Sequence, residues 1–202
     1  MRKLRIALWG LLAAAAVAAA GLAWQASRGA PNAPVRTAGA GIAAVGGPFR
    51  LTTHEGKTLS SADLAGRPFA VFFGFTHCPD VCPTTLFELS EHLKALGPRG
   101  DDLRVLFITV DPERDTRELL ATYLSSFDPR IIGLTGTREE IDAVTVAYKA
   151  TYMKVRTSGD DYTMNHTASV YLMDARGRFV GVLDYQEPRE TQLQKLRRLV
   201  AG

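Results

Sequence analysis

Two nearly continuous apolar runs occupy the middle of the chain, at 69–75 and at 103–110. Each has the length of a strand that is buried on both faces of a sheet. Between them, leucines recur every three or four residues over 84–96, which predicts a helix with one apolar face. Buried strands that alternate with helices are typical of a parallel central sheet.

The alternation of strand and helix signals continues further along the chain. Asp115-Thr116 begins an N-cap pattern for another helix. Its apolar positions are Leu119, Leu120, Tyr123 and Phe127. Residues 131–135 form a short apolar run, and Thr137 with Glu140 is a capping-box signature for the helix that follows. We therefore expect two more helices on either side of a third parallel strand.

Hairpin signals stand at both ends of this alternation. Residues 48–51 and 58–59 flank a polar turn, and the apolar runs at 169–173 and 179–183 are joined by a four-residue turn that ends in Gly177. Both patterns indicate antiparallel pairs. Pro188 then opens a terminal helix. Its apolar face consists of Leu193, Leu196 and Val200.

The N-terminal part of the chain differs in composition from the rest. Three basic residues precede an uncharged stretch over 6–24, which has about the 20 residues that a helix needs to cross a bilayer. We expect a membrane anchor or uncleaved signal over 1–26, a Pro/Gly/Ala-rich linker over 27–46 and a globular domain over 47–202. A cleaved signal peptide is the alternative. Because basic flanks stay in the cytoplasm, we expect a single-pass protein of a bacterial-type inner membrane, with its domain in the periplasm.

The charge distribution argues against a nucleic-acid partner. The whole chain has a pI near 9.0, which by itself suggests a polyanion as a ligand. Five of its 24 basic residues precede residue 47, however, whereas all 21 acidic residues follow it. The domain over 47–202 thus has 19 basic against 21 acidic residues, a net charge of −2. We therefore expect no nucleic acid among the partners.

Cys78 and Cys82 are the two cysteines of the chain, and they directly follow the first apolar run. At such a strand-to-helix junction, backbone N–H groups and the helix dipole favour the thiolate, which attacks disulfides and binds soft metal ions. A structural disulfide is a third interpretation. A bridge across three intervening residues would constrain the unfolded chain little, and a domain of this size can bury its own core.

The order of elements around the cysteines is typical of an α/β, thioredoxin-like and peroxiredoxin-related fold, in which helices flank a mixed sheet. Thiol oxidoreductases on this fold usually carry a C-x-x-C motif and a cis-proline just before the hairpin. Here three residues separate the cysteines, and His166 stands in the place of that proline. Two thiolates and one imidazole would suit a single copper ion, with zinc as the competing metal.

Other polar and soft side chains have weaker claims to the site. We expect His54 and His92 to be solvated, and His77 to point away from the metal if the strand continues. Met153 and Met164 are soft side chains for which we expect core packing. Asp80 is a candidate for orienting the site from outside the ligand set, although acidic residues are common near helix starts.

Three motifs of this sequence resemble the Sco/SenC family. They are Gly74–Pro83 (GFTHCPDVCP), 110–116 (VDPERDT) and His166-Thr167 before the next strand. The resemblance covers nearly the whole domain. It implies a membrane-anchored copper chaperone, not an enzyme, that serves the CuA centre of cytochrome c oxidase, with accessory thiol-disulfide reductase activity as an additional expectation.

The resemblance also implies particular ligands and partners. Cys78, Cys82 and His166 would hold one copper ion per domain, as Cu(I) or Cu(II). The acidic motif of the family maps onto Asp111, which would influence the site or the partner contact, or alternatively form a turn before Pro112. Asn165 departs from the Asp that often precedes the family's histidine, which would weaken the attraction for a cation.

The partners implied by the resemblance are cytochrome c oxidase subunit II and an upstream copper donor or thiol reductant. Two other functions use the same thiols. One is a membrane-anchored thiol-disulfide oxidoreductase or peroxidase, and the other is a redox or copper sensor that needs no turnover.

Overall fold

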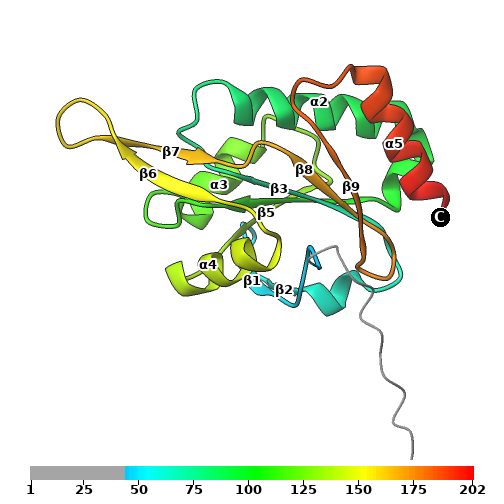
Figure 1. Ribbon diagram of the computed structural model, residues 1–202, viewed down its shortest axis with the longest axis horizontal. Helices are drawn as coiled ribbons and strands as arrows, with labels where there is room; N and C mark the ends of the chain where they lie inside the picture. Colours follow the sequence, from blue (N-terminus) through cyan, green and yellow to red (C-terminus); the bar gives the residue numbers. More distant parts are fainter. Residues whose placement is uncertain (1–43) are drawn as a thin grey trace, which may run out of the picture. The chain divides into compact units, whose positions relative to one another are not determined.

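A mixed seven-stranded sheet organises residues 44–202, the part of the chain that the computed structural model describes (Figure 1). Its strand order is β2-β1-β5-β4-β3-β8-β9, and β6 and β7 form a separate hairpin. The strands are β1 (Arg50–Thr53), β2 (Thr58–Ser60), β3 (Phe69–Gly74), β4 (Arg104–Thr109), β5 (Ile131–Thr135), β6 (Tyr152–Arg156), β7 (Tyr162–His166), β8 (Val170–Met173) and β9 (Phe179–Leu183). The α-helices are α2 (Val81–Leu96), α3 (Arg117–Leu124), α4 (Arg138–Ala147) and α5 (Arg189–Ala201), and short 3-10 helices span Ser61–Leu64 and Gly97–Asp101.

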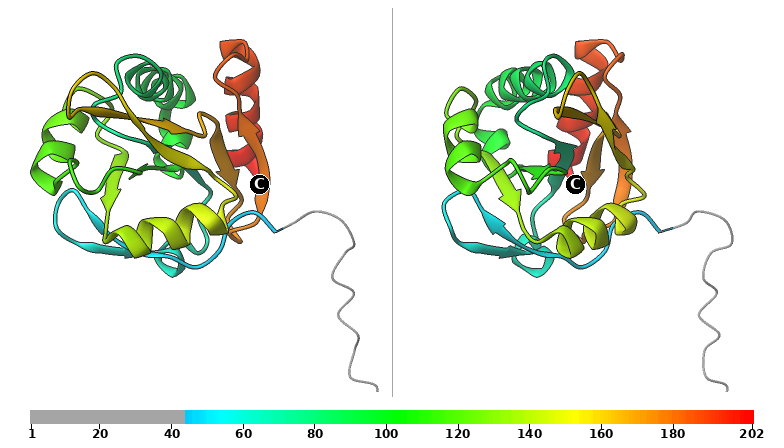
Figure 2. Two further views of the ribbon diagram at one scale, coloured as in Figure 1. Left: turned by 60° about the vertical axis from the view of Figure 1, so that its left-hand side comes forward. Right: turned by 90° about the vertical axis from the view of Figure 1, so that its left-hand side faces the viewer.

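The centre of the sheet is parallel, as the apolar runs predict. β3 pairs with β4 from Phe69 opposite Arg104 to Gly74 opposite Thr109, and β5 continues the parallel set on the other side of β4. β8 runs antiparallel to β3, so the sheet as a whole is mixed. α2 and α5 lie together over one face and α4 lies over the other (Figure 2). Every residue of β3 is buried for this reason, and the strand tolerates apolar side chains at consecutive positions.

The helix starts follow the predicted caps. Thr137 Oγ1 accepts from the Glu140 N–H (3.2 Å) and Glu140 Oε2 accepts from the Thr137 N–H (2.8 Å), which confirms the capping box of α4. Thr116 Oγ1 caps α3 by accepting from the Leu119 N–H. α3 ends at Leu124, whereas the predicted helix extended to Phe127. The hydroxyl of Ser125, at the end of this helix, donates to a backbone carbonyl of its last turn and so competes with the helical hydrogen bonds.

The β6–β7 hairpin is an element that the sequence pattern does not predict. It is antiparallel, with Tyr152 opposite His166 at one end and Arg156 opposite Tyr162 at the other. Figure 1 shows it projecting beyond the main sheet. Met164 is its one buried residue, so no regular alternation of apolar and polar positions marks its strands.

The expected anchor over 1–26 and all but the last three residues of the expected linker over 27–46 lie outside the described residues. Within 44–202, none of the helices combines the length and apolar character needed to cross a bilayer.

Candidate metal centre

The two cysteines lie where β3 passes into α2. Cys78 is half-buried in the connecting loop, and Cys82 is fully buried in the first turn of the helix. The Cys82 N–H points at the Cys78 sulfur, at an N–S distance of 3.3 Å. At Gly74 a Cβ atom would lie 3.1 Å from the Cys82 sulfur and 2.5 Å from the Phe107 ring. The glycine therefore allows the helix and its thiol to approach the end of the strand closely.

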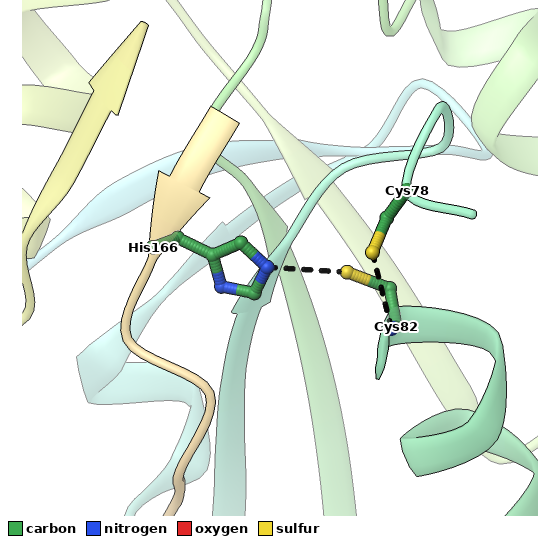
Figure 3. A group of neighbouring side chains, drawn as sticks. All are labelled: Cys78, Cys82 and His166. Carbon is green, nitrogen blue, oxygen red and sulfur yellow. Dashed lines mark hydrogen bonds between the residues drawn. The ribbon is translucent and has the colours of Figure 1, made fainter. Parts of the chain in front are cut away.

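His166 reaches the thiols from the end of β7, a distant part of the sequence (Figure 3). Its Nε2 atom lies 3.3 Å from the Cys82 sulfur, and its Nδ1 atom lies 2.9 Å from the Thr167 carbonyl oxygen. A carbonyl only accepts hydrogen bonds, so Nδ1 carries the proton and the lone pair of Nε2 faces the thiols. The rings of Phe72 and Phe75 contact the imidazole edge-on and hold it in this orientation.

The three potential ligand atoms, one each from Cys78, Cys82 and His166, all lie within 4.8 Å of one another. This is the set of residues that the sequence singled out. A metal ion can contact all three after small side-chain rotations, because they already face a common point (Figure 3). The arrangement thus supplies two sulfur donors and one nitrogen donor, a combination suited to copper or zinc.

The two sulfur atoms differ in acidity. The hydrogen bond with the Cys82 side chain lowers the pKa of Cys78 to about 4, against the opposing effect of its partial burial. Hydrogen bonds from the backbone of Asp80 and of Cys82 act in the same direction. The hydrogen bond with Cys78, together with burial, raises the pKa of the Cys82 thiol. The metal-free site therefore holds one thiolate, on Cys78, and one thiol, on Cys82.

This asymmetry predicts a selective alkylation of the reduced protein. Because Cys78 is a thiolate at all pH values well above about 4, its reaction with iodoacetamide should change little between about pH 5.5 and 8. An ordinary thiol would react on the order of 100-fold faster at the upper pH. Mass spectrometry of timed digests measures both cysteines. A steep rise in the Cys78 rate over this range would contradict the assigned thiolate.

The other candidate residues lie near the triad formed by Cys78, Cys82 and His166, but they differ in burial. Asp80 and Asn165 are exposed, and within the described part of the chain neither side chain hydrogen bonds to the three ligand residues. Asp111 has no exposed surface; its carboxylate accepts hydrogen bonds from Arg114 and from the Tyr162 hydroxyl. Its backbone carbonyl also accepts from the Arg114 N–H, so the turn interpretation is confirmed. Because the Asp111 carboxylate is buried, it can influence the site or a partner only through the residues that contact it.

Asp115 is the residue near the site that sequence reasoning missed. The sequence presents it as part of a helix start, but its carboxylate is fully buried and accepts hydrogen bonds from Thr76 and Thr109. Burial raises the pKa of Asp115 above its usual range. Its presence in the motif at 110–116 was a signal, yet nothing in the spacing indicated that it reaches the cysteine loop.

The remaining expectations for histidines and methionines are partly wrong. His92 is 1% exposed, with Nε2 2.9 Å from Gln192 Oε1 on α5, and the Nδ1 atom of half-buried His54 accepts from the Gly133 N–H at 3.0 Å. His92 is shielded from solvent and His54 is only partly exposed, because helix and strand neighbours distant in sequence cover them. His77 is exposed and lies outside the triad. Met164 is buried as expected, whereas Met153 is 60% exposed.

Comparison with known sequences gives consistent matches over the domain. A sequence model of the family described as SCO1/SenC matches residues 37–201. The human protein named Protein SCO1 homolog, mitochondrial, is 44% identical over 144 residues, which are 70% of this chain and 47% of that protein. Protein SenC of Rhodobacter capsulatus is 39% identical over 150 residues, which are 74% of this chain and 66% of that protein. The chain spans about half the length of the mitochondrial relatives that it matches.

Solved structures resemble the described domain closely. ScoI of Bradyrhizobium japonicum, determined with copper bound, is 49% identical and has a TM-score of 0.73 over 77% of this chain and 99% of its own. Yeast Sco1 with copper bound is 36% identical, with a TM-score of 0.72 over 79% of this chain and 90% of its own. The predicted mixed α/β, thioredoxin-like fold is confirmed.

Proposed function

The chain belongs to the SCO1/SenC family, and on this basis we propose that it is a copper chaperone in the assembly of cytochrome c oxidase. It would deliver copper to the CuA centre or prepare the cysteines of that centre. The observation that carries the proposal is the convergence of Cys78, Cys82 and His166 within 4.8 Å. The copper-bound state of the similar Bradyrhizobium japonicum ScoI supports the choice of metal.

The chemistry of the donors favours copper over other first-row metals. Thiolates are soft ligands that select Cu(I), and imidazole suits copper in either oxidation state. Structural zinc sites usually have four protein ligands, whereas three converge here in the described part of the chain. The fixed tautomer of His166 presents a lone pair without any prior loss of a proton. Copper is the cargo of this site, one ion per domain.

Transfer of the cargo requires exchange of ligands with a partner. Copper with three protein ligands leaves room for a further donor, so a cysteine of the recipient can bind before a ligand of this chain leaves. We propose subunit II of cytochrome c oxidase as the recipient and a copper donor or thiol reductant upstream. An inner-membrane anchor with the domain in the periplasm fits this role. Oxidation of Cys78 and Cys82 to a disulfide, with two electrons passing to an external oxidant, would remove both sulfur ligands.

Metal titration of the full chain tests the proposal. Under anaerobic conditions the reduced protein should bind one equivalent of Cu(I), and separately one of Cu(II). X-ray absorption at the copper edge should show two sulfur atoms and one nitrogen from the protein. Zn(II) serves as the competitor, and Cu(I) should displace it. Sub-stoichiometric copper, or a coordination shell without sulfur, would contradict the function.

A thiol-disulfide reductase is the second candidate, because the lowered pKa of Cys78 provides a nucleophilic thiolate. The two functions differ in their need for the imidazole. Reductase activity on a disulfide-containing peptide should require both cysteines and survive His166→Ala. Tight binding of Cu(II) should require all three residues. Loss of both properties in His166→Ala would argue against an independent reductase.

A further inference from the structure

The turn that follows β4 places two carboxylates in the interior of the domain. Asp111 and Asp115 each have 0% exposed surface. They belong to one tight turn, since the Asp115 N–H donates to the Asp111 carbonyl at 2.9 Å. Burial of two carboxylates is unfavourable unless both are satisfied by hydrogen bonds or ion pairs, so the partners of each carboxylate show what the turn is built to hold.

Asp115 holds the loop that carries the cysteines. Its Oδ2 atom accepts from the Thr76 N–H at 3.0 Å, and its Oδ1 atom accepts from the Thr76 hydroxyl at 2.6 Å. Thr76 stands two residues before Cys78 in the chain. The carboxylate therefore fixes both the backbone and the side chain of the cysteine loop.

Asp111 holds the hairpin that carries His166. Arg114 Nε and the Tyr162 hydroxyl both donate to the Asp111 carboxylate, the latter at 2.9 Å. The Arg114 guanidinium also donates to the Tyr162 carbonyl at 2.9 Å and stacks on the Tyr162 ring, with its central carbon 3.6 Å from the ring centroid. Tyr162 is the first residue of β7, and His166 is the last.

The Asp111 backbone and the Asp115 carboxylate are also linked through Thr109. The Asp111 N–H donates to the Thr109 hydroxyl at 2.9 Å, and that hydroxyl donates to Asp115 Oδ2 at 2.6 Å. Thr109 is the last residue of β4 and is fully buried. A shift of the backbone at Asp111 therefore disturbs the hydrogen bonds of the Asp115 carboxylate.

We propose that this turn is a clamp, defined by Asp111 and Asp115, that sets the distance between the cysteine loop and His166. The inference rests on the proposed function, since it concerns the same copper site. Asp111 and Asp115 are positioning residues and not ligands. Groups that orient metal ligands typically change metal affinity 10- to 100-fold when they are removed. The clamp has two arms: Asp115 with Thr76 on the side of the cysteine loop, and Asp111 with Arg114 and Tyr162 on the side of the hairpin. Because both arms belong to one turn, their effects on copper affinity are coupled.

Two mild substitutions test the clamp, one on each arm. Thr76→Val removes the hydroxyl that binds Asp115, and Tyr162→Phe removes the hydroxyl that binds Asp111. Each should weaken Cu(II) binding by about tenfold and shift the electron paramagnetic resonance parameters of bound Cu(II). Thr76→Ser, which keeps the hydroxyl, should restore them. Thr52→Val and Tyr185→Phe are matched controls, because neither hydroxyl makes a hydrogen bond in the described part of the chain.

The double variant measures the coupling. If the two arms acted independently, the two losses of Cu(II) affinity would multiply to about 100-fold, within a factor of about two. A clamp predicts a smaller loss, short of that product by more than about threefold. Unchanged affinity and spectra in the single variants, or a fully multiplicative double variant, would overturn the clamp while leaving the copper function intact.

Hydrogen exchange of the metal-free protein separates the clamp from the copper function. Tyr162→Phe should speed exchange of the Thr76 amide by about fivefold, the equivalent of one lost hydrogen bond of about 1 kcal/mol, although Tyr162 lies on the other arm. If the unsubstituted chain binds no copper, the proposed function fails, and the exchange measurement alone then tests whether Tyr162 and Thr76 are coupled through the clamp. Unchanged exchange at Thr76 in Tyr162→Phe would overturn the clamp.

Discussion

Replacing His166 with alanine is expected to lower the affinity for Cu(II) by at least about 100-fold. A four-ligand structural zinc site contributes about 10–16 kcal/mol, so one ligand of a comparable site contributes on the order of 3 kcal/mol, which corresponds to about 100-fold. The loss of Cu(I) affinity should be smaller, because the two sulfur atoms that remain are the ligands that Cu(I) prefers. The substitution therefore changes the preference between oxidation states as well as the affinity.

Competition titrations with chelators of each oxidation state measure the two losses separately. His54→Ala is the matched control, because His54 lies outside the group of Cys78, Cys82 and His166 and hydrogen bonds to the Gly133 backbone, not to the cysteine loop. It should retain both affinities within about twofold. Equal behaviour of His166→Ala and His54→Ala would show that the imidazole at 166 is not a copper ligand.

Replacing Arg114 with methionine is expected to destabilise the fold by about 3–5 kcal/mol, the range for breaking a buried ion pair from one side. The substitution leaves the Asp111 carboxylate with no exposed surface and without its cation, while the Arg114 side chain itself is 20% exposed. The Tyr162 hydroxyl is then the one side chain that still donates to Asp111 in the described part of the chain. One neutral donor does not compensate a buried negative charge.

Chemical denaturation at neutral pH measures this loss of unfolding free energy. Lys57→Met serves as the control, since it breaks an ion pair with Glu55 in which both side chains are more than half exposed. Such a surface pair contributes about 0–1 kcal/mol. Adding Asp111→Asn to Arg114→Met should recover part of the stability, because it removes the orphaned charge. A loss below about 1 kcal/mol in Arg114→Met would contradict the buried pair.

The sequence was sufficient to predict the central strands and their helices. β3 and β4 are covered on both faces, so their residues are apolar at consecutive positions, and that pattern can be recognised without a structure. The caps at Thr116 and Thr137 are local in sequence and were equally visible. The candidate ligand residues followed from fold reasoning, since a histidine replaces the proline that would face the thiols.

The parts that could not be predicted depend on contacts between distant segments. Asp115 and Thr76 are separated by 39 residues, and no periodicity reports that one is buried against the other. His92 is covered by a helix 100 residues further along the chain. The β6–β7 hairpin is held by ion pairs and aromatic contacts of Arg114 and Lys154, so its strands lack the alternation by which sheets are recognised.

The unequal burial of the three candidate ligand residues would set an order of events for copper release. Cys78 is half-buried in a loop, whereas Cys82 is fully buried and the imidazole of His166 is held edge-on by Phe72 and Phe75. An incoming ligand that binds the copper could displace the accessible Cys78 first and the buried Cys82 last. The three bonds to copper would therefore break in a fixed order, and the bond to the buried Cys82 sulfur would break last. The lifetime of that bond would determine how long this protein and the recipient stay bound to each other.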